Sequence, residues 1–212
     1  MWSKNMMLLA SVLIVLAACA AKVGGSAPPP VDNPDQAAAN ALVTLQKLVT
    51  EANYKDLGFD SVDQVNRAVL AVPMPVFEIG LDRIRSYQPG QDVNSLLTPS
   101  METIYPVTVD GQTKSSVTVV KKASGYLPAS FGNAAVVVAL SRYRGNRPEE
   151  SFAVHIPVPN MYFLGTRTAD RLMLTPVIES SQLPLRVGVA VPAEEVIQAI
   201  VPLVQEYNGL PI

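Results

Sequence analysis

Apolar positions near the start of the chain repeat with the period of a helix. Residues 35–52 (DQAAANALVTLQKLVTEA) form the clearest such stretch. Its apolar residues recur at spacings of three and four: Leu42, Leu45 and Val49, with Ala38 or Ala52. This spacing places them on one helical face, and Asp32 or Asp35 can cap the start. Residues 60–69 (DSVDQVNRAV) predict a second, shorter helix.

Two further helices are predicted later in the chain. Residues 133–144 (NAAVVVALSRYR) predict a middle helix, which Asn133 can cap. Residues 191–209 (VPAEEVIQAIVPLVQEYNG) predict a C-terminal helix with Pro192 in its first turn. The stripe expected to be buried consists of Val196, Ile200, Leu203, Val204 and Tyr207.

Between these helices the apolar period shortens to two, which is typical of strands. In residues 104–120, Asp110-Gly111 separates two such runs and predicts a hairpin. A two-residue turn would pair Val109 with Gln112. A three-residue loop would give three aligned pairs: Tyr105 with Val117, Val107 with Ser115, and Val109 with Thr113. The second register is favoured because it keeps the apolar positions on one face.

The remaining expected strands lie in residues 72–84, 125–132, 151–158, 160–165 and 171–178. In residues 151–158 the alternation is regular. One face is expected to hold Phe152, Val154, Ile156 and Val158. Residues 160–165 and 171–178 are apolar on both faces, which predicts central strands covered above and below.

Together these patterns predict one α+β domain over residues 35–212. We expect an antiparallel sheet of about six strands, packed against N-terminal, middle and C-terminal helices. Hairpin, extended piece and helix follow one another in residues 104–144 and again in residues 160–207. An internal two-half duplication is therefore a further expectation.

The N-terminus has the layout of a secretory signal peptide. Residues 6–18 are almost uniformly apolar, with Lys4 before them, and this run is shorter than the ~20 apolar residues of a membrane-spanning helix. Leu16-Ala17-Ala18-Cys19 resembles a bacterial lipobox. The resemblance implies that residues 1–18 are removed and that Cys19 is lipidated.

Residues 19–34 would then form a lipidated, Gly- and Pro-rich tether between a bilayer and the folded domain. Two or more acyl chains hold a protein at a membrane, whereas one does so marginally. Ala20 stands where an aspartate would suggest inner-membrane retention, so the resemblance implies the outer membrane, facing the periplasm.

Composition narrows the chemistry that remains. The 212 residues carry a formal charge of -2, which gives no electrostatic footprint for nucleic acid. Because Cys19 is the only cysteine and His155 the only histidine, we expect no internal disulfide, no metal centre and no cofactor.

No catalytic residue is predicted. Any mechanism with a histidine base must use His155, yet no G-x-S-x-G elbow occurs. The carboxylate pairs Glu149/Glu150 and Glu194/Glu195 are adjacent in sequence, so their side chains point in different directions on a helix.

Aromatic residues gather in the strand half and suggest a recognition surface. The candidate residues are Tyr105, His155, Tyr162 and Phe163. The leading hypothesis is a non-enzymatic envelope lipoprotein that binds another protein or assembles a complex in the periplasm. The alternatives are a carrier for a lipid or other apolar ligand and, third, a hydrolase that uses His155.

Residues 73–84 (PMPVFEIGLDRI) and the two-half layout also resemble Tic22-type periplasmic chaperone domains. That resemblance assigns no functional residue to this chain.

Overall fold

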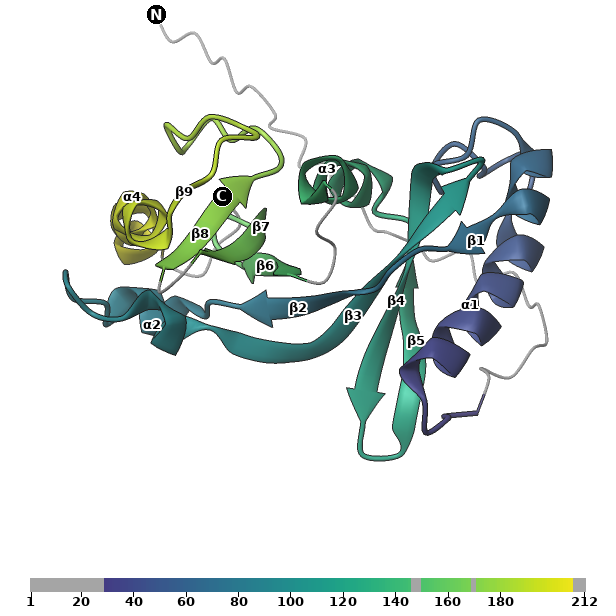
Figure 1. Cartoon of the computed structure of the whole chain (residues 1–212), viewed down its shortest axis with the longest axis horizontal. Helices are drawn as coiled ribbons and strands as arrows, with labels where there is room; N and C mark the ends of the chain where they lie inside the picture. The colour runs from purple at the N-terminus through teal and green to yellow at the C-terminus, as the bar shows by residue number, and fades with distance from the viewer. Residues whose placement is uncertain (1–28, 146–149, 169–170, 208–212) are drawn as a thin grey trace, which may run out of the picture.

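One sheet of nine strands forms the centre of the molecule (Figure 1). The computed structural model describes residues 29–145, 150–168 and 171–207. The strands are β1 (Val69–Leu70), β2 (Met74–Glu78), β3 (Thr98–Val109), β4 (Gln112–Lys122), β5 (Gly125–Phe131), β6 (Ser151–Ile156), β7 (Met161–Thr168), β8 (Arg171–Pro176) and β9 (Val191–Pro192). Their order is β5-β4-β3-β2-β6-β7-β8-β9, and β1 pairs with β3 beside β2.

The α+β class is confirmed, although the sheet has more strands than the six or so predicted. The surplus comes partly from β1 and β9, which have two residues each. A strand of two residues is too short to show the alternation of apolar and polar residues from which strands are predicted. The strand pairs are antiparallel except β2 with β6, which is parallel.

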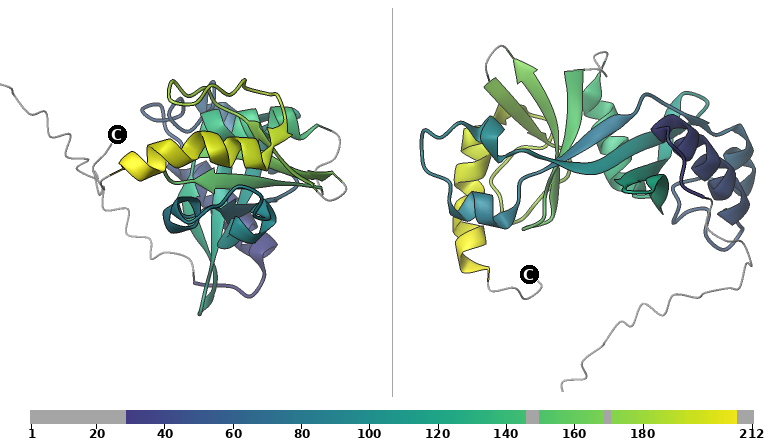
Figure 2. Two further views of the ribbon diagram at one scale, coloured as in Figure 1. Left: turned by 90° about the vertical axis from the view of Figure 1, so that its left-hand side faces the viewer. Right: turned by 90° about the horizontal axis from the view of Figure 1, so that it is seen from below.

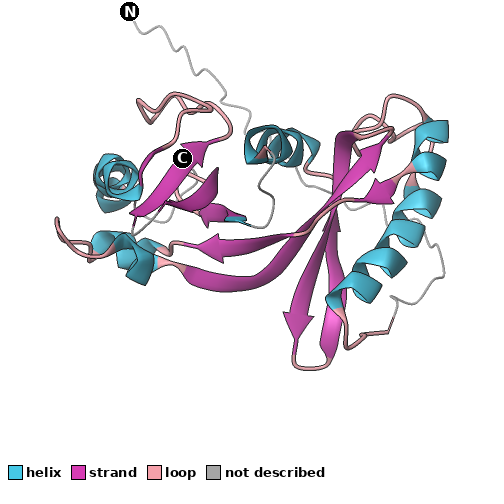
Figure 3. Ribbon diagram, in the orientation of Figure 1, coloured by secondary structure: helices cyan, strands magenta, loops and turns pink. Residues whose placement is uncertain are grey.

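Figure 3 shows the helices around this sheet. They are α1 (Pro34–Leu48), α2 (Leu81–Arg85), α3 (Ala134–Arg144) and α4 (Ala193–Glu206), with two 3₁₀ helices, η1 (Val62–Arg67) and η2 (Val93–Leu96). The four predicted helices are thus present, the second of them as 3₁₀. Among the residues described, no helix is long and apolar enough to cross a membrane.

Of the two predicted helix caps, that of α1 is wrong, whereas Asn133 does stand at the N-cap position of α3. Asn33, rather than Asp32 or Asp35, caps α1, because its Oδ1 accepts hydrogen bonds from the backbone N–H of Asp35 at 2.8 Å and of Gln36 at 3.3 Å. Asn133 precedes α3 in the left-handed conformation, with φ of 54°, and its side chain makes no capping hydrogen bond.

The helices pack around the sheet (Figure 2). The buried apolar side chains between helices and sheet form three clusters. α1 packs on β3 and β4 through small residues of the helix, and Tyr105 and Val107 face it. α3 packs against the other side of β3, where Ile104 lies. α4 and α2 close the far end of the sheet. As predicted, the residues of β6 that face α4 alternate along the strand: Phe152, Val154 and Ile156, followed by Val158.

The β3–β4 hairpin combines the register of a two-residue turn with that of a three-residue loop. Tyr105 pairs with Val117 and Val107 with Ser115, as predicted, but Val109 pairs with Gln112. Asp110 and Gly111 have positive φ of 51° and 76°, as a two-residue type I′ turn requires. The register then shifts at Lys114, which is left over as a bulge. The bulge returns the apolar positions to one face.

The sheet order is symmetric about the β2–β6 pair. On one side lie β3, β4 and β5, followed in sequence by α3, and on the other lie β7, β8 and β9, followed by α4. A two-fold axis parallel to the strands would relate the two halves without reversing strand direction. Such a relation makes the central pair, β2 and β6, parallel. The expected two-half layout is therefore present in the topology.

Both outer edges of the sheet are obstructed. On β5, Val31 exchanges two backbone hydrogen bonds with Tyr126, at 3.1 and 2.7 Å, and Pro128 has no N–H to donate. On β8, β9 pairs with residues 173 and 174, and the Gly188 N–H binds the Pro176 carbonyl at 2.9 Å. These features leave little free edge for the addition of a strand.

Candidate functional site

His155 and Tyr162 stand side by side where β6 turns into β7. They are directly paired across the two strands, and their rings stack with centroids 4.6 Å apart and planes 20° apart. Tyr162 packs against the cluster beneath α3, so this pair belongs to the α3 side of the sheet. The His155 side chain is 19% exposed, so one part of the imidazole reaches solvent.

Two polar residues hold the imidazole from either end. Nε2 of His155 lies 3.0 Å from Oδ1 of Asn160, and Nδ1 lies 3.5 Å from Oε1 of Glu78. Glu78 is the direct neighbour of His155 across the parallel β2–β6 pair. Asn160 lies in the tight turn that joins β6 to β7, with φ of 60°. The ring is therefore fixed in position.

The phenol of Tyr162 lies in a partly buried and negative environment. Burial is the largest cause that raises its pKa, and the nearby carboxylates of Glu102 and Glu78 raise it further. The site thus combines an imidazole and a neutral phenol with two carboxylates.

A surface hollow of about 570 Å³ lies beside this pair. Tyr162 and Asn160 form one wall, and polar residues of the 178–182 segment form another. Ile178 contributes an apolar group that is 40% exposed. The hollow therefore offers hydroxyl, amide and carboxylate groups around a small apolar surface.

The structure does not bring the other two candidate residues to this site. Tyr105 is buried beneath α1, where its hydroxyl donates a 2.7 Å hydrogen bond to Oδ1 of Asp35. Phe163 is fully buried in the cluster beneath α4, on the opposite face of β7 from Tyr162. Cys19 and Glu149 lie outside the described residues.

Sequence reasoning missed Glu78 and Asn160. The contact with Glu78 depends on a parallel pairing between strands about 75 residues apart, which no local pattern reveals. The signal for Asn160 was the run Pro157-Val158-Pro159-Asn160, because an asparagine that follows prolines is typical of a turn residue with positive φ.

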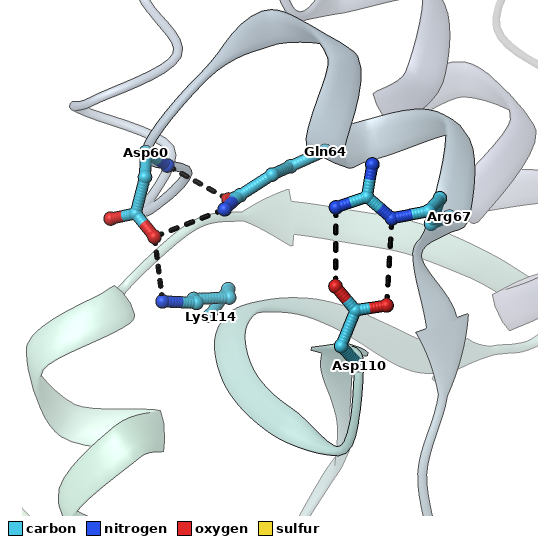
Figure 4. Close-up of polar contacts among 5 residues, drawn as sticks. All are labelled: Asp60, Gln64, Arg67, Asp110 and Lys114. Carbon is cyan, nitrogen blue, oxygen red and sulfur yellow. Dashed lines mark hydrogen bonds and ion pairs between the residues drawn. The ribbon is translucent and has the colours of Figure 1, made fainter.

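A second polar cluster joins η1 to the tip of the β3–β4 hairpin (Figure 4). Oδ2 of Asp60 accepts hydrogen bonds from Lys114 at 2.8 Å and from Gln64 at 3.1 Å. These hydrogen bonds, with that of Lys114 the largest cause, lower the pKa of Asp60. Arg67 pairs with Asp110 at 3.1 Å. Each charge has its partner within the cluster, which indicates a structural role.

Within the described part of the chain, no three His, Cys, Asp or Glu side chains are grouped so that they could hold a metal ion. Comparison with protein-family models, with curated proteins and with solved structures found no match to this chain. The fold and the site therefore define the protein only by class, as an α+β domain built on a single, mostly antiparallel sheet.

Proposed function

We propose that this protein is a lipid-anchored envelope protein that binds another protein through the surface around His155 and Tyr162. The anchor is Cys19, and the proposed location is the periplasmic side of the outer membrane. In this role the tether keeps the folded domain near the bilayer, where it binds a component of a membrane-associated complex.

The observation that carries this proposal is Tyr162, which lines an open hollow and is stacked on His155. Tyrosine presents an apolar ring and a polar hydroxyl together, and it is enriched among the residues that contribute most to binding at protein interfaces. Asn160 and Glu78 hold the imidazole in place, so little side-chain entropy would be lost on binding.

The sheet edges favour side-chain recognition over strand addition. Val31 and Pro128 obstruct β5, and β9 and Gly188 obstruct β8. A partner is therefore expected to contact a face of the molecule.

The packing gives less support to a carrier of apolar ligands. The space under each helix is filled by the chain's own side chains, including Leu45, Leu140 and Ile200, which have no exposed surface. A hydrolase is also less favoured, because Asn160 Oδ1 lies 3.0 Å from Nε2 of His155, the nitrogen that would have to accept a proton from a nucleophile while Nδ1 faces Glu78.

Photo-crosslinking in native envelopes tests the proposal. A benzophenone amino acid replaces Ile178 in the hollow, or Val43 on the outer side of α1 as a control of similar exposure. We expect one discrete protein adduct from position 178 and none from position 43. Tyr162→Ala should weaken that adduct at least several-fold. Equal adducts from both positions, or none from position 178, would contradict the proposal.

A further inference from the structure

A second hollow, of about 530 Å³, opens where β2 runs beside the start of β6. Its floor is an aromatic pair, Phe77 and Phe152, whose ring centroids lie 4.9 Å apart in an edge-to-face arrangement. Both rings belong to the α4-side cluster, whereas Tyr162 belongs to the α3-side cluster. The hollow is thus separate from the site around His155.

A glycine fixes the position of the Phe152 ring. Gly165 is paired with Phe152 across β6 and β7, and a Cβ at position 165 would lie 2.5 Å from a ring carbon. The missing side chain lets the ring lie directly over the β7 backbone. Phe152 is therefore held in place beneath Arg167, with only 4% of its surface exposed.

Two arginines line the hollow, and they differ in their contacts. Arg144 holds the chain before β2, since it donates to the carbonyls of Val72 and Pro73 at 2.7 Å each. Arg167 is exposed, and its guanidinium carbon lies 4.9 Å from the centre of the Phe152 ring. Among the residues that the structure describes, no carboxylate pairs with Arg167.

Glu150 also lines the hollow, so its two arginines and one glutamate leave a net charge of +1. Arg167 is the arginine of the two whose side chain is exposed, and its guanidinium can bind a carboxylate in a bidentate manner. Exposed Pro75 extends the apolar surface beside Phe77. A ligand that fits this hollow must carry a carboxylate within a few covalent bonds of an apolar side chain.

We propose that this hollow binds a segment of a partner protein in which a carboxylate adjoins an aromatic or aliphatic side chain. The carboxylate binds Arg167 and the apolar side chain lies on Phe77 and Pro75. The segment is held by its side chain, because Arg144 already occupies the carbonyls of Val72 and Pro73. The hollow has a volume typical of a small binding pocket, ~300–1,000 Å³.

Saturation-transfer NMR with the full chain in phosphatidylcholine nanodiscs tests this inference. The probe is N-acetyl-glycyl-phenylalanine with a free carboxylate, and its C-terminal amide is the uncharged control. Empty nanodiscs supply the background. We expect the acid to bind at least ten-fold more tightly than the amide. In Arg167→Gln the acid should bind no better than the amide, and Arg167→Lys should retain part of the preference.

Arg142, an exposed arginine on α3, supplies the matched control. Arg142→Gln should leave the preference for the acid unchanged. Equal binding of acid and amide to the unmodified protein would overturn the inference, as would a preference that survives Arg167→Gln or disappears in Arg142→Gln. Binding of dodecanoate without binding of the peptide acid would also overturn it, in favour of a free amphiphile. Because these measurements use no partner protein, their failure leaves the crosslinking result at position 178 unaffected.

Discussion

The two halves of the sheet share an order of strands but differ in how they are packed. In the N-terminal half, β3 and β4 have 12 and 11 residues, and the buried residues of α1 are three alanines and Leu45. In the C-terminal half, the counterparts β7 and β8 have eight and six residues, and α4 buries larger groups such as Ile197 and Ile200. Small residues bring α1 close to long, twisted strands, whereas large ones fill the space above short strands.

The same difference appears where each half turns after its first strand. The β2–β3 connection contains α2 and η2 and adds to the core beneath α4. The β6–β7 connection crosses within residues 157–160. This short turn leads directly into the start of β7, where Tyr162 lies on the α3 side and stacks on the partly exposed His155. The equivalent connection thus adds core residues in one half, whereas in the other it leaves the partly exposed pair His155 and Tyr162 beside a short turn.

The largest expected effect is a difference in stability between substitutions on the two faces of β7. Phe163→Ala should lower the free energy of unfolding by about 3–5 kcal/mol, because it empties a fully buried site beneath α4. Tyr162→Ala, at the neighbouring position on the α3 side, should cost less than half as much. Denaturant unfolding of both variants measures the difference. Equal losses would mean that Tyr162 is also core and would weaken the proposed binding role.

The next effect tests the close approach of loop and strand in the N-terminal half. Gly58 has φ of 93°, and a Cβ there would lie 2.0 Å from the Lys114 carbonyl oxygen. Gly90 has φ of 90°, but nothing lies within 4 Å of its Cβ position. Gly58→Ala should cost about 3 kcal/mol or more and Gly90→Ala about 1 kcal/mol. Similar losses in unfolding experiments would show that backbone strain alone matters at both positions.

A smaller effect tests the packing of α1 through small residues. Ala41 is fully buried against the sheet, and Ala39 is exposed on the same helix. Ala41→Leu should lower stability by about 2 kcal/mol through overpacking. Ala39→Leu should change it by less than about 0.5 kcal/mol. Thermal unfolding measures both variants, and a neutral Ala41→Leu would contradict the close packing described for this half.

The smallest effect concerns pH. Burial, followed by the hydrogen bond to Asp35, raises the pKa of Tyr105 above that of an unfolded tyrosine, which is about 10. Neutral Tyr105 therefore contributes fully to the free energy of unfolding below pH ~10. This contribution is lost as the pH rises above that value. Burial of Tyr162 acts in the same direction. In unfolding measurements between pH 8 and 11, Tyr105→Phe should show a shallower loss of stability than the unmodified protein. An unchanged slope would contradict this assignment.

Sequence patterns predicted the parts whose buried face follows a single period. The positions of α1 and α4 and the α4-facing residues of β6 follow such a period. Within the two helices the buried stripe differs in part from the prediction: Leu42, Leu203 and Tyr207 are only partly buried, whereas Ala41 and Ile197 are buried. The bulge at Lys114 was not predicted, because one extra residue changes the register without changing the apolar pattern on either side. Nor was the parallel β2–β6 pair, which forms between distant segments and places Glu78 beside His155. Of the four candidate site residues, aromatic character alone could not separate buried Tyr105 and Phe163 from partly exposed Tyr162.

The proposed role depends on attachment of the chain to a bilayer through Cys19. Mass spectrometry of the N-terminal peptide, taken from protein isolated from its native envelope, tests this most directly. The account predicts a peptide that begins at residue 19 and carries acyl chains on its cysteine. A peptide with a free thiol at Cys19, or one that begins elsewhere, would contradict it.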